Sequence, residues 1–182
     1  RDGVLNEDRS YVYRWEDFIF LPGVVEALRA FRKLGYLLVV ITNQSGIARG
    51  FYEESDVLAL HDRMTICLRS QGIDLADVYY CPHHPEGAVS RYAFACSCRK
   101  PAPGMILRAV AEHDIDLSRS LLVGDKTTDL EAGKLAGITS LYLVTSSGQG
   151  GNPVFSPTVQ SVESLHDVAL ILGGFPANRC GK

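Results

Sequence analysis

The sequence predicts an α/β fold around a parallel sheet, and three observations lead to this fold class. The chain has 182 residues, a length that favours one domain. Hydrophobic residues make up 46% of it and charged residues 21%, an ordinary balance for a globular protein. Short apolar segments alternate along the chain with helical patterns. That alternation is typical of a Rossmann-like parallel sheet with helices on both faces.

Each predicted strand is short, rich in Val, Leu or Tyr, and followed by polar or glycine-containing sequence. The four strands are residues 37–42, 78–81, 121–124 and 141–144. Apolar residues at helical spacing predict helices from Pro22 to Gly35, over 57–68, from 103 to 113, over 128–136 and over 162–172. Residues 146–157 are rich in Ser, Gly and Pro, which predicts a surface loop before the last helix.

Charge and hydropathy exclude two classes of partner. The chain has 18 Lys and Arg against 21 Asp and Glu, a net charge of −3, so it has no basic field to hold nucleic acid. The longest apolar runs, such as residues 37–41, are far shorter than the roughly 18 residues that span a bilayer. The first residues turn polar at once and form no signal-peptide pattern. We therefore expect a cytoplasmic monomer that binds neither nucleic acid nor membrane.

Two polar segments follow predicted strands, where ligands bind in parallel sheets. Thr42-Asn43-Gln44-Ser45 offers a hydroxyl and backbone N–H groups that can hold phosphate oxygens. Gly124-Asp125-Lys126 offers a carboxylate and a cation, with Asp129 four residues after Asp125, which suits a divalent cation beside a phosphate. Taken singly, each segment could also be structural: a strand-ending turn in the first case and a helix cap at Asp125 in the second.

Arg99 and Lys100 are two adjacent cations that precede a predicted helix. A solvated basic pair is the ordinary interpretation of such a dipeptide. Beside a phosphate site, however, Lys100 can neutralise charge on a transferred group, and Arg99 can bind a second anion through two hydrogen bonds.

Three of the five cysteines gather near two histidines. Cys81 and His83, followed by Cys96 and Cys98, form a Cys₃His set that suits tetrahedral structural zinc. Buried cysteines in a core are the alternative. Such a zinc has no open coordination position, so it shapes a loop and performs no chemistry. Because Cys98 leads directly into Arg99, we expect the zinc-binding loop to position both cations.

With Asp2-Gly3 near the start, these motifs resemble the haloacid dehalogenase-type phosphatases. The signatures of that family are a DxDG loop, a strand ending in Thr or Ser, a Lys and a GDxxxD-like loop, and their order and separation match nearly the whole chain. The cysteine cluster is similar to that of a branch containing sugar-bisphosphate and histidinol-phosphate phosphatases, in which the same four positions bind zinc. The resemblance also implies a capless domain, since no stretch between the motifs is long enough for a second fold.

The resemblance implies a two-step reaction. An Asp carboxylate attacks phosphorus to form an aspartyl-phosphate, which water then hydrolyses. The Asp two residues later, here Asp2, protonates the leaving alkoxide and then activates the water. Mg²⁺ is held by the nucleophile, by Asp2 through its backbone carbonyl, and by Asp125. Thr42 and Lys100 hold the equatorial phosphoryl oxygens.

The resemblance places the nucleophilic Asp directly before Arg1, at the end of an apolar strand. We therefore expect residues 1–182 to be one phosphatase domain whose first strand and nucleophile lie upstream of Arg1. Without that Asp, the chain should not catalyse.

The family also implies which residues contact a small phosphorylated sugar. These substrate-binding positions are Asp8, Arg9, Ser10, Tyr11, Thr42, Asn43, Gln44, Ser45, Arg99, Lys100 and Lys126. The stretch 8–11 could equally be a surface turn. We expect Arg99 to recognise a phosphate that is not cleaved, which favours a heptose 1,7-bisphosphate losing its C7 phosphate. Histidinol phosphate is the alternative substrate, and an inactive zinc-stabilised phosphosugar-binding module is the alternative from another class.

Overall fold

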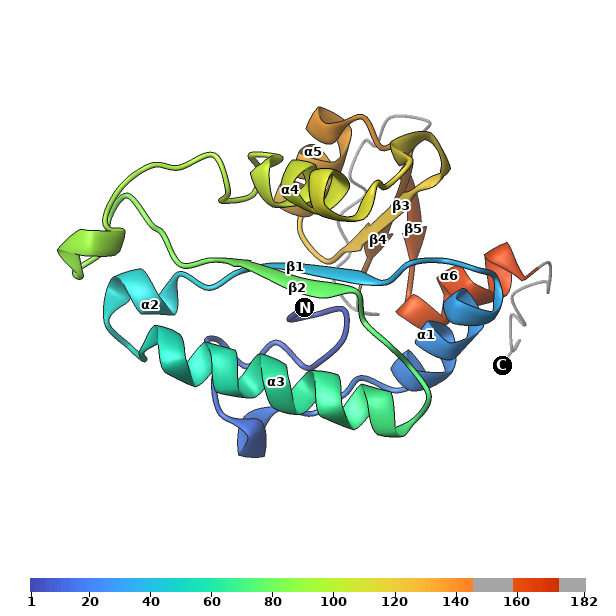
Figure 1. Cartoon of the computed structure of the whole chain (residues 1–182), viewed down its shortest axis with the longest axis horizontal. Coiled ribbons are helices and arrows are strands. Elements are labelled where there is room, and N and C mark those ends of the chain that lie inside the picture. The colour runs from blue at the N-terminus through green and yellow to red at the C-terminus, as the bar shows by residue number, and fades with distance from the viewer. Residues whose placement is uncertain (146–158, 174–182) are drawn as a thin grey trace.

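The computed structural model describes residues 1–145 and 159–173. Its strands form two parallel ladders (Figure 1). Strand β1 (Val39–Asn43) pairs with β2 (Asp77–Cys81). Strands β3 (Leu121–Gly124), β4 (Ser140–Val144) and β5 (Val159–Val162) form the second ladder in that order. The parallel α/β class is confirmed.

The expectation of one continuous sheet is not met within the described residues. Strand β1 is hydrogen-bonded only to β2, and β3 only to β4, so each ladder has an edge without a strand partner. A cavity of about 220 Å³ is lined by residues of both β1 and β3, among them Val40 and Leu122. Its lining is mostly apolar, including Leu5 and Ile106. This apolar slot borders both β1 and β3, the two strands whose outer edges have no strand partner among the described residues.

Six α-helices accompany the strands in the described residues: α1 (Val24–Lys33), α2 (Gly46–Arg49), α3 (Glu54–Ser70), α4 (Gly104–His113), α5 (Thr127–Ala136) and α6 (Leu165–Leu172). Short 3-10 turns occur at Trp15–Asp17, Ser90–Tyr92 and Leu117–Arg119. All five predicted helices are present. The loop predicted over 146–157 lies outside the described residues.

The predicted start of the last helix is wrong. Val162 ends β5, and α6 begins at Leu165. Ser164 sets this boundary because its Oγ accepts a hydrogen bond from the backbone N–H of Asp167 (3.2 Å), while its own N–H donates to the Asp167 carboxylate (2.9 Å). Such a capping box satisfies N–H groups that a helix start leaves unpaired.

Helices cover both faces of the β1–β2 ladder, with α4 on one side and α3 on the other (Figure 1). Leu60, Met64 and Leu68 of α3 are almost fully buried, as their helical spacing predicts. They share one hydrophobic core with Val40 of β1 and Val144 of β4. Packing thus joins the two ladders that hydrogen bonds leave separate, and the carboxyl ends of β1 and β3 contribute to one site.

Candidate active site

Thr42 lies near the carboxyl end of β1 and is 3% exposed. Its Oγ1 accepts a hydrogen bond from Gln44 Nε2 (2.9 Å), and Oε1 of the same Gln44 amide accepts one from the Tyr52 hydroxyl (2.9 Å). Gln44 Nε2 also lies 3.4 Å from Asp2 Oδ2. The chain Tyr52–Gln44–Thr42 therefore fixes the Thr42 hydroxyl beside Asp2. The sequence had no signal for Tyr52, because its contact with Gln44 depends on how α2 folds back.

Asn43 positions Lys100 through two hydrogen bonds. Its Nδ2 donates to the Lys100 carbonyl (3.1 Å), and its Oδ1 accepts from the Lys100 backbone N–H (3.0 Å). These bonds link the end of β1 to the segment that precedes α4. The side-chain amide of Asn43 thus uses both its donor and its acceptor within the protein. The sequence predicted Asn43 as a substrate contact and gave no indication of these bonds to Lys100.

The Lys100 ammonium forms a buried ion pair. Lys100 Nζ lies 2.6 Å from Asp129 Oδ1, and the two side chains are 9% and 8% exposed. Burial opposes ionisation of Asp129, but the charge and hydrogen bond of Lys100 hold the pKa of that carboxyl below its usual range. Gly124 allows this approach, because a Cβ there would lie 2.3 Å from the Cβ of Asp129. The Asp129 carboxylate therefore compensates the buried ammonium of Lys100 and holds it near the end of β1, where its Nζ also reaches the Ile41 carbonyl (3.2 Å).

Asp2 lies in the loop that opens the described chain, where Arg1 and Asn6 hold its carboxylate. Arg1 Nη2 lies 3.0 Å from Asp2 Oδ1, and Asn6 Nδ2 donates to the same oxygen (2.9 Å). Burial raises the pKa of Asp2, but the charge of Arg1 and these hydrogen bonds outweigh burial and lower it. Asp2 is thus an ionised carboxylate that lies close to Gln44, the partner of Thr42.

Asp125 packs against the Asp2 loop. A Cβ on Gly3, which has a φ of +75°, would lie 2.4 Å from Asp125 Oδ2. Only glycine fits at position 3, because this position requires a left-handed backbone conformation and leaves no room for a Cβ beside the Asp125 carboxylate. Burial raises the pKa of Asp125 despite the neighbouring Lys126. The backbone of residues 2–3 and the Asp125 carboxylate supply the hard oxygen ligands that Mg²⁺ prefers.

Within residues 8–11, Asp8 contacts the site by pairing with Lys126. Lys126 Nζ lies 3.0 Å from Asp8 Oδ2 and 3.7 Å from Asp125 Oδ2. Arg9 instead pairs with Glu7 (2.7 Å), and its side chain is 49% exposed. Ser10 and Tyr11 have backbone φ values of 58° and 66°, in the left-handed region that residues other than glycine rarely adopt. Strain of this kind often marks a ligand-binding segment.

Ser45 and Arg99 are the remaining two expected substrate contacts. Ser45 is half-buried and directly precedes α2. Arg99 Nη1 donates to the backbone carbonyl of His83 (3.3 Å). Arg99 therefore lies at the junction between the cysteine loop and Lys100, as the sequence predicted.

Cys81, His83, Cys96 and Cys98 converge on one point, with all ligand atoms within 4.8 Å of one another. The sulfur of Cys98 lies 3.1 Å from that of Cys81 and 3.3 Å from His83 Nδ1. Three thiols and one imidazole this close together form a group that could hold a metal ion. The neighbouring His84 is not part of the cluster.

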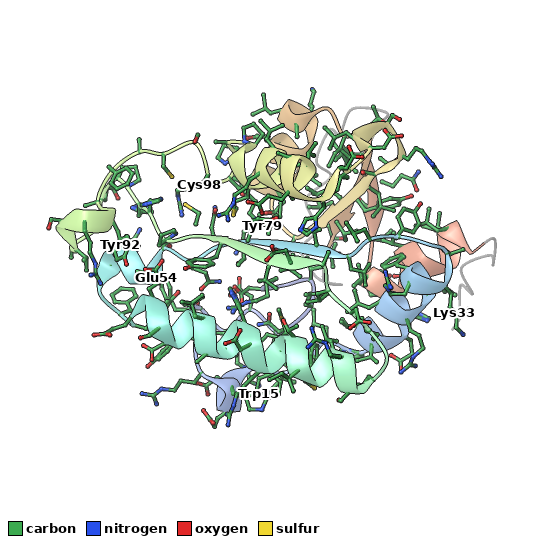
Figure 2. The ribbon with its side chains drawn as sticks, viewed as in Figure 1. Trp15, Lys33, Glu54, Tyr79, Tyr92 and Cys98 are labelled. Atoms are coloured by element: carbon green, nitrogen blue, oxygen red, sulfur yellow. The ribbon has the colours of Figure 1, made fainter. Side chains whose placement is uncertain are left out.

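The loop that carries this cluster is attached to α3 through Glu54 (Figure 2). The Glu54 carboxylate accepts hydrogen bonds from the hydroxyls of Tyr92 (2.6 Å) and Tyr80 (2.8 Å). These two bonds and burial, which opposes them, leave the pKa of Glu54 below its usual value. Tyr92 in turn accepts a backbone hydrogen bond from His84 (3.1 Å). None of these contacts had a signal in the sequence.

A second cluster of potential ligands among the described residues contains Asp77, Glu112 and His113. Both oxygens of Glu112 are already engaged, one by the Tyr79 hydroxyl (2.5 Å) and one by Arg108 Nε (2.9 Å). Figure 2 places Tyr79 beneath α4, on the ladder and away from Glu54. This cluster links β2 to α4, whereas the Cys₃His cluster has ligand atoms free for a metal.

Comparisons with known proteins agree with this geometry. A family model described as HAD-hydrolase-like matches residues 97–168. D-glycero-beta-D-manno-heptose-1,7-bisphosphate 7-phosphatase of Photorhabdus laumondii is 43% identical over 178 residues, covering 96% of this chain and 93% of the relative. The chain belongs to the heptose-1,7-bisphosphate 7-phosphatase family of haloacid dehalogenase-like hydrolases.

Other members support the same family. The enzyme of that name from Haemophilus influenzae is 47% identical over 154 residues, covering 85% of this chain and 81% of its own. The crystal structure of D,D-heptose 1,7-bisphosphate phosphatase from B. bronchiseptica, complexed with magnesium and phosphate, matches with a TM-score of 0.80 and 33% identity over 96% of this chain and 95% of that one. The expected family and its phosphatase fold are confirmed. In the described part of this family member, no helix is long and apolar enough to cross a membrane.

Proposed function

We propose that the chain is a Mg²⁺-dependent phosphatase that hydrolyses the C7 phosphate of D-glycero-D-manno-heptose 1,7-bisphosphate and leaves heptose 1-phosphate. The observation that carries the proposal is the 43% identity, over 96% of the chain, to a 7-phosphatase for this substrate. The site geometry agrees, since Thr42, Lys100 and Asp2 lie where they can hold and protonate a phosphate ester. The product would serve the synthesis of nucleotide-activated heptose for bacterial surface polysaccharide.

The side chains divide the chemistry among them. Thr42 donates its hydroxyl, and Lys100 its ammonium, to the phosphoryl oxygens on which charge accumulates. Asp2, once it carries a proton, donates that proton to the leaving alkoxide, and the carboxylate that results later takes a proton from the attacking water. When bound by Asp125 and the Asp2 carbonyl, Mg²⁺ offsets negative charge on the phosphoryl group. The crystal structure of the B. bronchiseptica relative, complexed with magnesium and phosphate, supports this metal.

The slot between β1 and β3 supports the proposal that the first strand and the nucleophile precede Arg1. A strand inserted there would pair with both free edges and bury its side chains against Val40 and Leu122. Arg1 itself lines the slot, so a residue directly before it would lie at the carboxyl end of that strand, beside Asp2. An Asp at that position could attack phosphorus and form the aspartyl-phosphate.

The Cys₃His cluster is proposed to hold structural zinc. Its four ligand atoms leave no position for substrate, so the metal would hold the loop that carries Arg99. Three thiol ligands need a reducing environment, which supports a cytoplasmic protein. The substrate is small and the proposed groups, the upstream Asp included, would belong to one polypeptide, so we propose that the protein acts as a monomer without a cap domain.

The test is phosphate release with Mg²⁺ from heptose 1,7-bisphosphate and from histidinol phosphate, using protein that carries the upstream strand and Asp. We expect strong preference for the heptose. The opposite preference would assign the enzyme to histidinol phosphate, and no release from either would leave a phosphosugar-binding module. Arg99→Ala should weaken binding of the bisphosphate at least tenfold more than binding of a simple monophosphate, because Arg99 is placed for the phosphate that stays. Equal losses would contradict that role.

A further inference from the structure

Two side chains outside the expected substrate-binding set lie next to Arg99. Arg49, at the end of α2, places its Nη2 3.2 Å from Nε2 of His84, which lies on the loop after β2. Arg99 Nη1 is bonded to the backbone of the neighbouring His83 (3.3 Å). Helix α2 begins three residues after β1, so Arg49 follows closely along the chain from the strand that carries Thr42. Arg49, His84 and Arg99 therefore gather at the edge of the phosphoryl site.

The contact between Arg49 and His84 brings two donors together. The backbone N–H of Glu86 points to Nδ1 of His84 (3.1 Å), which makes that nitrogen an acceptor. A neutral imidazole then carries its hydrogen on Nε2, where the guanidinium of Arg49 also offers only N–H groups. Nε of Arg49 is buried without a hydrogen-bond partner. Buried donors need an acceptor, so the pair lacks a third group that accepts from both.

The charge around these residues points to an anion. Within residues 1–145 and 159–173, neither Arg49 nor Arg99 lies within salt-bridge distance of a carboxylate. By contrast, Lys100 is paired with Asp129 and Lys126 with Asp8. The site thus neutralises its two lysines internally and leaves two half-buried guanidinium groups free. Guanidinium groups bind phosphate through paired, charge-assisted hydrogen bonds.

The backbone holds this arrangement rigidly. Val89 N–H donates to the carbonyl of Ala48 (2.9 Å), the residue before Arg49. A Cβ on Gly87 would lie 2.8 Å from the same carbonyl oxygen, so the loop is seated closely on α2. The Glu54 bonds to Tyr92 and Tyr80 secure the same loop from the other side. Arg49 and His84 therefore face each other at a separation that the fold fixes.

We propose that Arg49 and His84 complete, together with Arg99, a subsite for the phosphate monoester that the enzyme does not cleave. The inference rests on the proposed function, because a substrate with two phosphates supplies the second anion. In this subsite the retained phosphate accepts from the Arg49 guanidinium and from Nε2–H of His84, which removes the conflict between the two donors. The subsite selects a bisphosphate over a monophosphate and orients the sugar so that C7 faces Thr42 and Lys100.

The test is calorimetric binding of heptose 1-phosphate, a probe that carries only the retained phosphate, with inorganic phosphate as the second probe. We expect Arg49→Ala and His84→Ala each to raise the Kd for heptose 1-phosphate at least tenfold, as for loss of a hydrogen bond to a charged group. Arg49→Lys should recover only part of the affinity, because an ammonium keeps the positive charge but cannot form the two parallel hydrogen bonds of a guanidinium. Arg91→Ala is the matched control, since Arg91 lies on the same loop but stacks on Tyr92 and should leave the Kd unchanged.

Turnover in the chain that carries the nucleophile separates a subsite from a scaffold. For Arg49→Ala we expect a raised KM for the bisphosphate, unchanged kcat/KM for p-nitrophenyl phosphate and full metal content at the Cys₃His cluster. Loss of metal, or equal losses on both substrates, would assign Arg49 a structural role and overturn the proposal. Unchanged Kd and KM in a wild type that hydrolyses the bisphosphate would also overturn it, with the proposed function intact. A wild type that binds neither probe and releases no phosphate would refute the proposed function itself.

Discussion

The buried pair of Lys100 and Asp129 gives a prediction whose magnitude follows from the structure. Asp129→Asn keeps the size of the side chain and an oxygen that can accept the Lys126 N–H, which now donates to Asp129 Oδ2 (3.0 Å). It removes the negative charge 2.6 Å from Lys100 Nζ. The ammonium then keeps only the Ile41 carbonyl, 3.2 Å away, as a polar partner. The variant thus leaves a charge buried and uncompensated.

Removing one partner of a buried ion pair costs about 3–5 kcal/mol. For a protein of this length, each kcal/mol lowers Tm by about 2–4 °C, so the expected decrease is about 6–20 °C. Urea unfolding and calorimetry at pH 7 measure both quantities. Phosphatase activity should fall as well, because the Lys100 ammonium loses the ion pair that holds it in place.

Two further variants show whether burial is the cause. Asp74→Asn breaks the pair with Arg69 (3.3 Å), in which both side chains are 64% exposed, and should cost less than about 1 kcal/mol. Replacing Lys100 by Met and Asp129 by Leu together should recover most of the stability, because neither charge then remains buried. If Asp129→Asn destabilises the protein no more than Asp74→Asn does, the reasoning is refuted.

Two other predictions concern protons and metal. Burial, and after it the charge of Arg1, lower the pKa of His61 from 6.5 to about 3 in the folded protein. Between pH 6.5 and about 3 the unfolded chain therefore binds more protons than the folded protein does, so His61 lowers the free energy of unfolding as the pH falls through this range. Relative to His61→Leu, the wild type should lose about 1.4 kcal/mol per pH unit below 6.5 in urea unfolding; a pH-independent difference would contradict this. Stripping the metal with a chelator, or Cys96→Ser, should lower Tm and weaken binding of the bisphosphate more than that of inorganic phosphate. Unaltered binding by metal-free protein would exclude a positioning role for the loop.

Local patterns predicted the elements whose own residues define them. The bounds of β3 agree with the predicted 121–124 because the apolar run is too short for a helix and ends at Gly124. Helix α2 was missed because one turn, Gly46–Arg49, is too short for a periodic signal. Strand β5 was missed because Gln160 and Ser161 are exposed and polar, and its pairing with β4 decides its conformation.

The sequence alone determined the α/β class, the family, and which residue types could carry the chemistry, because strand ends and motif residues are local features. It also placed Arg99 beside the cysteine loop, since the two are adjacent in the chain. Tertiary structure decided what those residues do to one another. The Asn43–Lys100 bonds, the Lys100–Asp129 pair and the approach of Arg49 to His84 join segments distant in sequence. Such contacts depend on how helices and loops pack on the strands, and packing is a property of the whole chain that no single segment encodes.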